Sequence, residues 1–160
     1  MLSIGIDIGG TKILGAIVDD NGKVISEKRV SSPAHDPELM VNEVASLILE
    51  LSAQAALEMV PVGVAAAGFI DADQANVLYA PNLSWRDEPL RERLEEKIQR
   101  SLVIENDANA AGWAEYRFGA GMGSKDMVML TLGTGVGGAV ISDGAIRRGG
   151  FGIAGELGHI

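Results

Sequence analysis

Two glycine-rich segments, each directly after a short apolar run, constrain the fold of this chain more than any other feature. The first, residues 7–12, reads Asp-Ile-Gly-Gly-Thr-Lys, and the second, residues 132–138, reads Leu-Gly-Thr-Gly-Val-Gly-Gly. Glycine tolerates positive φ and lets a ligand approach the backbone, so that successive N–H groups converge on one anion. Each loop also carries a threonine, and the first adds an acid and a lysine. Together they predict a metal-bound polyphosphate held from two sides.

The residues around the first loop favour a hairpin over a P-loop. Strands are predicted on both sides of it, at 2–7 and 12–18, whereas a Walker A loop opens a helix and places its lysine further on. The order of strand, glycine loop and strand starts again at residue 127. This restart predicts two similarly built lobes with a phosphate between them.

The remaining elements follow from periodicity and turn signals. A turn at 19–22 leads to a strand at 24–30, and Asp36-Pro37-Glu38 begins an amphipathic helix that is expected to run to about residue 58. Further along, we expect a strand at 60–66, two short β segments around a turn at 71–74, an exposed helix over 88–100, a buried strand at 102–104, a helix over 108–118 with Trp113 in the core, and a strand at 139–142. The alternation predicts an α/β layer architecture.

Composition narrows the function classes. A chain of 160 residues has room for one domain or two small lobes, and its net charge of −9 argues against nucleic acid or an anionic membrane as a partner. There is no cysteine for a disulfide or a thiolate metal site. No apolar run approaches the ~20 residues that span a bilayer, and the first residues lack the pattern of a signal peptide. We therefore expect a cytoplasmic enzyme that acts on small molecules.

Two polar groups stand out as candidates, each with an ordinary structural alternative. Asp107 follows a predicted buried strand, where it faces the ligand-binding edge of an open α/β sheet. The residue type suits a general base, but taken alone it favours the N-cap of the helix that follows, and the two roles are compatible. Glu156 and His159 form a Glu-x-x-His pair that fits a ligand contact, half of a metal site or a plain loop.

Four motifs in this order, at residues 7–12, 105–109, 132–138 and 155–159, resemble those of the ROK family of bacterial sugar kinases and sugar-responsive repressors. The whole chain is similar to the N-terminal part of the family's glucokinases. The resemblance implies an α/β, actin/hexokinase-like (ribonuclease H-like) ATPase fold with ATP and sugar between two lobes. Residues 1–105 would form the N-terminal small lobe, and residues 106–160 would begin the larger lobe.

The resemblance also assigns roles to single residues. Asp107 is expected to be the catalytic base, and Asp7 is expected to organise magnesium, through water. The sugar would be bound by Asn106, Asp107, Glu156, His159, Gly68 and Asn82, with Pro81, Leu83 and Trp85 along one wall. The phosphates would be bound by Asp7, Gly9, Gly10, Thr11, Lys12, Gly133, Thr134, Gly135 and Gly137. His159 would bind zinc only where the family's cysteine-rich segment is present.

The implied activity is ATP- and Mg²⁺-dependent phosphorylation of glucose to glucose 6-phosphate. Kinases for fructose, allose or N-acetylmannosamine remain alternatives, as does polyphosphate as the donor. A sugar-responsive repressor is disfavoured because such proteins carry a helix-turn-helix domain before the first loop, which here begins at residue 7. Family members continue past Glu-x-x-His, so we expect either a fragment or a truncated version of a longer product, with kinase activity in doubt for these residues alone. The complete protein is expected to be a homodimer or higher oligomer.

Overall fold

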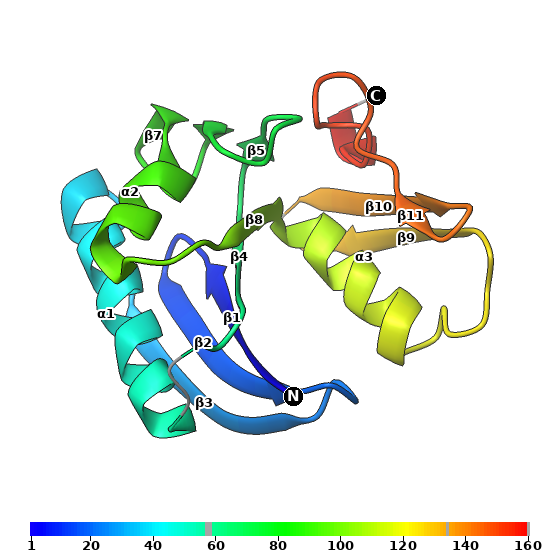
Figure 1. Ribbon diagram of the computed structural model, residues 1–160. Coiled ribbons are helices and arrows are strands. Elements are labelled where there is room, and N and C mark those ends of the chain that lie inside the picture. The colour runs from blue at the N-terminus through cyan, green and yellow to red at the C-terminus, as the bar shows by residue number, and fades with distance from the viewer. Residues whose placement is uncertain (57–58, 134, 160) are drawn as a thin grey trace.

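Three β-sheets and three α-helices make up the computed structural model, which describes residues 1–56, 59–133 and 135–159 (Figure 1). In chain order the elements are β1 (Leu2–Ile8), β2 (Lys12–Asp19), β3 (Val24–Ser31), α1 (Pro37–Ala55), β4 (Val62–Ala66), β5 (Phe69–Ile70), β6 (Val77–Ala80), β7 (Trp85–Glu88), α2 (Leu90–Ile98), β8 (Val103–Asn106), α3 (Asp107–Phe118), β9 (Met127–Leu132), β10 (Val136–Ser142), β11 (Ala145–Ile146) and a short 3-10 helix (Leu157–His159). The α/β architecture predicted from the sequence is confirmed.

The first sheet has the strand order β3-β2-β1-β4-β8. β1, β2 and β3 form an antiparallel meander, whereas β4 runs parallel to β1 and β8 runs parallel to β4. Alternate β1 side chains, Ile4, Ile6 and Ile8, are buried in the main core, to which α1 and α2 also contribute. Because β1, β4 and β8 are parallel, their carboxyl ends meet at one edge, where an open α/β sheet binds ligands.

The second sheet repeats the beginning of the first. Its order is β11-β10-β9, with antiparallel pairing throughout, and α3 packs against one of its faces (Figure 1). The predicted restart of the strand-loop-strand pattern is thus present. The opposite face of β9 is exposed: Val128, Leu130 and Leu132 are 64%, 57% and 82% accessible. A third, small sheet, β5-β6-β7, is formed by the residues between β4 and β8, two strands of the first sheet.

Several local predictions were wrong. Helix α1 ends at Ala55, because Ala56 takes a left-handed conformation (φ 52°) and its N–H bonds to the Ala53 carbonyl. Strand β8 is not buried throughout, since it is the edge of its sheet and Val103 is 57% exposed. Trp113 is half-buried and stacks on Tyr116, with ring centroids 5.4 Å apart, and is not a core residue.

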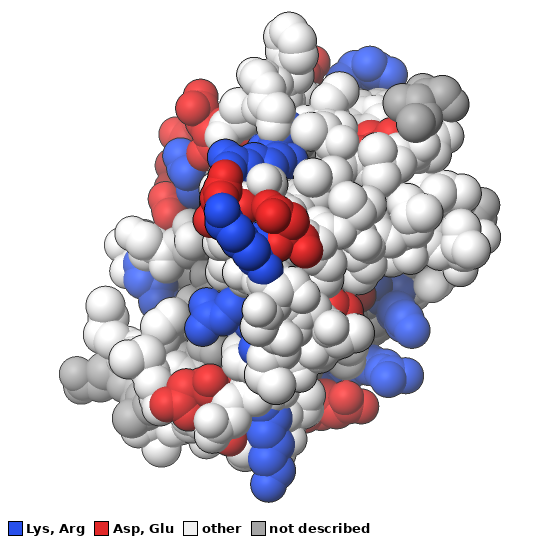
Figure 2. All heavy atoms as spheres, turned by 90° about the vertical axis from the view of Figure 1, so that its right-hand side faces the viewer, with Lys and Arg blue, Asp and Glu red and all other residues white. Residues whose placement is uncertain are grey.

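The surface over α3 and the second sheet mixes charges of both signs. Figure 2 shows acidic and basic side chains beside one another on this face, next to a broad area of uncharged atoms. Within the described residues, no helix combines the length and the apolar character needed to cross a lipid bilayer.

Close packing at Gly112 is expected to hold α3 on the second sheet. A Cβ at Gly112 would overlap the Cβ of Ala139, whereas a Cβ at Gly63 would meet nothing within 4 Å. We expect Gly112→Val to lower the free energy of unfolding by about 1 to 3 kcal/mol, because overpacking strains a filled contact. The matched control Gly63→Val should change it by less than about 0.5 kcal/mol. Urea denaturation measures both, and equal effects would contradict a close helix–sheet contact.

Candidate active site

A cleft of about 970 Å³ opens at the carboxyl ends of the parallel strands. Its walls come from both units: the ends of β1, β4 and β8, the first turn of α3, and the loop between β9 and β10. The predicted site residues that line it are Asp7, Gly68, Asn82, Asn106, Asp107, Gly133, Gly135, Gly137 and Glu156. Residues from four separate sequence motifs therefore meet in one space.

The first glycine loop is the hairpin that the sequence predicted, since β1 pairs with β2 in antiparallel fashion and the Gly9 N–H donates to the Lys12 carbonyl at 3.0 Å. Gly10 packs on the backbone of Asn82, where an added Cβ would lie 3.0 Å from the carbonyl oxygen. Gly10 and Thr11 line an adjoining pocket of about 790 Å³, which Asn82 also borders. Gly9 and Lys12 line neither space.

The second glycine loop forms the opposite wall. The Gly133 N–H donates to the Gly135 carbonyl at 2.9 Å, and a Cβ at either residue would meet nothing within 4 Å. Gly137 is confined: a Cβ there would lie 2.7 Å from the Thr131 hydroxyl and 3.1 Å from the Ala108 Cβ. Its lack of a side chain is what lets α3 approach the loop. Thr134, the predicted hydroxyl donor, lies outside the described residues.

Asn106, not Asp107, caps helix α3. The Asn106 Oδ1 accepts the Asn109 N–H at 3.0 Å, while its Nδ2 donates to the Gly68 carbonyl at 3.0 Å and to Glu156 Oε1 at 3.2 Å. Asp107 is the first helical residue, and its Oδ1 accepts the adjacent Ala108 N–H at 2.9 Å. The capping alternative for Asp107 is therefore wrong, and its carboxylate opens to the cleft.

The buried amide of Asn106 serves as a positioning group. Its exposed fraction is only 7%, and both ends of the amide are already hydrogen-bonded within the protein. A side chain with its donors and acceptor in use holds its neighbours in place: Gly68 on one side and Glu156 on the other. The expected contact of Asn106 with a sugar hydroxyl stays a prediction.

Two carboxylates of the cleft repel each other. Burial in the cleft walls raises the pKa of Asp107, although the Ala108 N–H and its own N–H offset part of the rise. Burial and then the nearby charge of Asp107 raise the pKa of Asp7, against a smaller opposing effect of Lys12. Negative charge is thus concentrated where the sequence predicts a polyphosphate and its metal.

The donor set of the cleft fits a magnesium ion. Magnesium prefers carboxylate oxygen and keeps several waters, so a single carboxylate such as Asp7 in an open, wet cleft is a suitable anchor. A divalent cation would also relieve the repulsion that raises the pKa of Asp7. Among the described residues, no group of three or more acidic, histidine or cysteine side chains is arranged to enclose a metal. The chain has no cysteine, so it does not supply the expected zinc ligands beside His159.

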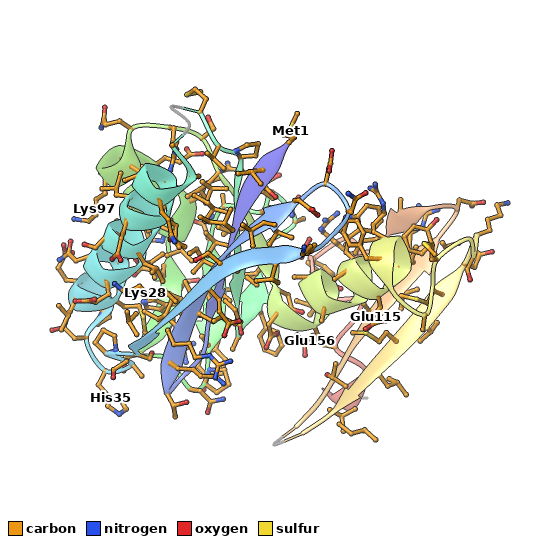
Figure 3. The ribbon with its side chains drawn as sticks, turned by 90° about the horizontal axis from the view of Figure 1, so that it is seen from below. Met1, Lys28, His35, Lys97, Glu115 and Glu156 are labelled. Atoms are coloured by element: carbon orange, nitrogen blue, oxygen red, sulfur yellow. The ribbon has the colours of Figure 1, made fainter. Side chains whose placement is uncertain are left out.

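The segment after β11 brings Glu156 to the start of α3, as Figure 3 shows, while Glu115 lies toward the other end of that helix. His159 belongs to the short 3-10 helix, but its side chain lies outside the described residues. Gly68 is packed against the backbone of Tyr79, which leaves no room for a Cβ. The predicted wall is only partly correct, because Pro81 and Asn82 line the cleft whereas Leu83 and Trp85 are 3% and 2% exposed and belong to the core.

Sequence reasoning gave no role to Glu105, Arg148 or Gln74, which meet beside the cleft. The Glu105 carboxylate accepts hydrogen bonds from both other side chains. Glu105 stood within a quoted motif, but nothing in the sequence indicated its partners, which lie 31 and 43 residues away.

Comparison with known proteins agrees with this geometry. The paired strand-loop-strand units around one cleft define the class of actin-like ATPases. The model of the ROK family matches residues 3–160, and the chain belongs to this family. It is 46% identical over 159 residues to a glucokinase of Streptomyces coelicolor, covering 99% of this chain and 49% of the relative. It is also 30% identical over 162 residues to the xylose repressor of Bacillus subtilis, and this alignment covers 99% of this chain and 42% of the repressor.

A solved structure shows the same fold. The ROK family glucokinase from Streptomyces griseus, in complex with glucose and AMPPNP, superposes with a TM-score of 0.91 at 46% identity, covering 100% of this chain and 50% of that one. The chain thus has the actin-like ATPase fold expected from the resemblance. It spans about half the length of the curated glucokinase that it matches.

The raised pKa of Asp107 has a consequence for stability. A carboxyl whose folded pKa lies above its unfolded value favours folding at low pH, and this contribution is lost as the pH rises above the ordinary aspartate pKa of about 3.9. We expect Asp107→Asn to raise the melting temperature at neutral pH, because the amide keeps the Ala108 contact without the charge. The gain should shrink as the pH is lowered toward about 4.

Asp126 provides a control of opposite sign. Hydrogen bonds from the Asp143 N–H and Ser142 lower its pKa, so Asp126→Asn should lower the melting temperature at neutral pH. Thermal denaturation across pH tests both variants. A melting temperature of Asp107→Asn at or below that of the parent at neutral pH would show that the cleft does not penalise this charge.

Proposed function

We propose that the protein containing this chain phosphorylates the 6-hydroxyl of glucose with ATP, as a glucokinase. The observation that carries the proposal is that Asp107 lies in one cleft with Asp7 and with the second glycine loop. This arrangement brings a carboxylate base beside a polyphosphate site, which is what phosphoryl transfer to a hydroxyl requires. Membership of the ROK family and 46% identity to a glucokinase support the same reaction.

Asp107 is proposed to accept the proton of the sugar hydroxyl. Phosphoryl transfer needs little covalent help from the protein, so positioning and proton transfer account for most of what side chains do. Burial raises the pKa of Asp107 and so makes its carboxylate a better base, and its position as the first residue of α3 fixes the backbone that carries it. The γ-phosphoryl group of ATP is transferred to the sugar oxygen as its bond to the bridging oxygen breaks and ADP leaves, and the proton of the hydroxyl moves to Asp107.

The two glycine loops are proposed to bind the phosphates. Gly133 and Gly135 leave open space where a side chain would stand, so a phosphate can approach their backbone. The hairpin at Gly9 and Gly10 approaches from the first sheet, beside Asp7. Bound magnesium, held by Asp7 through water, would neutralise phosphate charge. With this assignment, backbone N–H groups and magnesium would let an acidic chain bind a polyanion without a basic surface.

Glu156, Asn82 and Gly68 are proposed to bind the sugar, with Asn106 holding two of them. A carboxylate such as Glu156 can accept hydrogen bonds from two adjacent hydroxyls, and such a contact is strong and directional. His159 stays a proposed sugar ligand because it follows Glu156 by three residues. Phosphorylation rates of the purified full-length protein with glucose, fructose, allose and N-acetylmannosamine test the sugar preference. Rates with ATP and with polyphosphate for each sugar test the phosphate donor.

Asp107→Asn in the full-length protein is expected to lower kcat by about 10² to 10⁴, because general-base catalysis contributes a factor of that size. Glucose affinity should stay close to that of the parent, since the amide preserves the shape of the site. Coupled ADP-release kinetics and calorimetric titration with glucose measure the two quantities. The remote control Asp20→Asn, which removes an exposed acid paired with the N-terminus, should behave as the parent. Retention of most of kcat in Asp107→Asn would remove this residue from the reaction.

Glu156→Ala is expected to raise the KM for glucose by roughly 10- to 100-fold, which corresponds to the loss of a charged hydrogen bond of about 1.5 to 3 kcal/mol. The KM for ATP should change little, because Glu156 lies on the sugar side. Initial-rate measurements with each substrate varied in turn separate the two effects. An unchanged glucose KM would rule out the proposed sugar contact.

A further inference from the structure

A nearly buried carboxylate beside the cleft binds three separate segments of the chain. Glu105 is only 13% exposed and immediately precedes the Asn106-Asp107 pair. Its Oε1 accepts the Asn106 N–H at 3.0 Å and the Asn109 Nδ2 at 3.2 Å, both at the start of α3. Its Oε2 accepts the Gln74 Nε2 at 3.1 Å and the Arg148 Nε at 2.8 Å, and the Arg148 Nη2 also donates to it.

Arg148 begins the segment that carries Glu156, here called the Glu156 loop (residues 148–156). This loop is attached to neighbouring positions at its two ends: Arg148 pairs with Glu105, and Glu156 accepts from Asn106. In between, Gly152 has a positive φ of 85° and packs so closely on the backbone of Ile70 that a Cβ would overlap it. Two consecutive residues of β8 therefore hold both ends of one loop.

The side-chain amide of Asn109 is oriented by its hydrogen bond to Glu105. Asn109 is 2% exposed, and its Oδ1 has no hydrogen-bond partner among the residues that the structure describes, although its Nδ2 bonds to Glu105. Turning the amide over would place its oxygen against the carboxylate, which is unfavourable. The Oδ1 instead faces the loop, where a Cβ on Gly155 would lie 3.0 Å away. Glu105 thus fixes both the first turn of α3 and the surface on which the loop rests.

We infer that the Glu105–Arg148 ion pair positions Glu156 for the sugar, an inference that rests on the proposed function. Neither residue of the pair is part of the cleft lining; they lie together beside a separate cavity of about 420 Å³, on the side of β8 and α3 where Trp113 also lies. Both therefore act through the loop, as positioning residues. The planar guanidinium of Arg148 donates twice to one carboxylate, which fixes direction in a way that an ammonium group does not.

Gln74 supports the pair from the third segment. Its Nε2 donates to the Ile104 carbonyl at 3.0 Å as well as to Glu105, and its own backbone is left-handed, with φ 52°. The turn that holds it is organised by Asp71, which accepts the N–H groups of Ala75 and Asn76. Burial alone would raise the pKa of Asp71, but these N–H groups and the Asn76 side chain hold it below its ordinary value. These hydrogen bonds hold the turn, and so Gln74, in position to bond to the Glu105 carboxylate.

The test compares Arg148→Met and Arg148→Lys with Arg147→Met in the full-length protein. Arg147 is the matched control, because it is the neighbouring arginine and pairs with exposed Asp143 at 3.5 Å, away from the cleft. We expect Arg148→Met to raise the glucose KM by about tenfold or more, with the ATP KM within about twofold, the pattern of lost binding on one substrate. Arg148→Lys should recover only part of the loss, and Arg147→Met should match the parent.

Hydrogen exchange without substrates tests the positioning independently of the reaction. Residues 149–156 should exchange faster in Arg148→Met than in the parent, while the α1 core keeps its protection. The double variant Glu105→Gln/Arg148→Met should exchange at residues 149–156 as fast as Arg148→Met, since Arg148→Met already removes the ion pair that attaches this end of the loop.

Three outcomes overturn the inference: an unchanged glucose KM in Arg148→Met, equal increases in both KM values together with a lower melting temperature, or unchanged exchange in residues 149–156. The first two mean that the pair does not serve the sugar side in particular. Failure of the proposed function is recognised separately, as a parent protein that phosphorylates no hexose. In that case faster exchange in Arg148→Met still supports attachment of the loop, and unchanged exchange overturns it.

Discussion

The junction between β8 and α3 is the constraint on which the rest of the site depends. At this point the first sheet ends and the helix that supports the second sheet begins, with no residue between the two elements. Asn106 satisfies the free N–H of the helix start and at the same time holds Gly68 and Glu156. A single buried amide thereby orders three segments around Asp107. Because β8 is joined to α3 without a loop, the backbone of Asp107 is held in place by both the strand and the helix.

The cleft beside the junction between β8 and α3 also holds two nearby carboxylates. Asp7 and Asp107 come from two different elements, yet burial raises the pKa of both, and the charge of Asp107 raises that of Asp7 further. Arrangements of this kind are unfavourable for folding and useful for binding a cation or accepting a proton. The burial of these two charges is unfavourable for folding. The apolar core under the sheet, in which Ile4, Ile8 and Ile13 are fully buried, stabilises the fold and offsets this cost.

Motifs with a local signature could be predicted from the sequence, and partnerships over long distances could not. The hairpin at Gly9-Gly10 and the succession of strands along the chain follow from apolar periodicity and turn residues, whereas a shared site for Asp7 and Asp107 was expected from the resemblance to the ROK family. The end of α1 at Ala55 could not be predicted in this way, because no glycine or proline marks it and Ala56 takes the left-handed conformation instead. The cap was assigned one residue late, since Asn and Asp are equally good caps and stand side by side at 106 and 107.

The same reasoning explains why Trp113 and Glu105 were misjudged or missed. A tryptophan among apolar helical neighbours fits the core, but α3 meets the second sheet through Gly112, which leaves Trp113 half-buried beside the Glu105–Arg148 pair. Glu105 is an acid on an edge strand, a position that usually faces water. The three-dimensional return of the chain after β11 brings it the cationic partner Arg148, and that return also delivers Glu156. Glu105, an acid that the sequence alone would place in contact with water, is thus one of the residues that attach the second unit to the first.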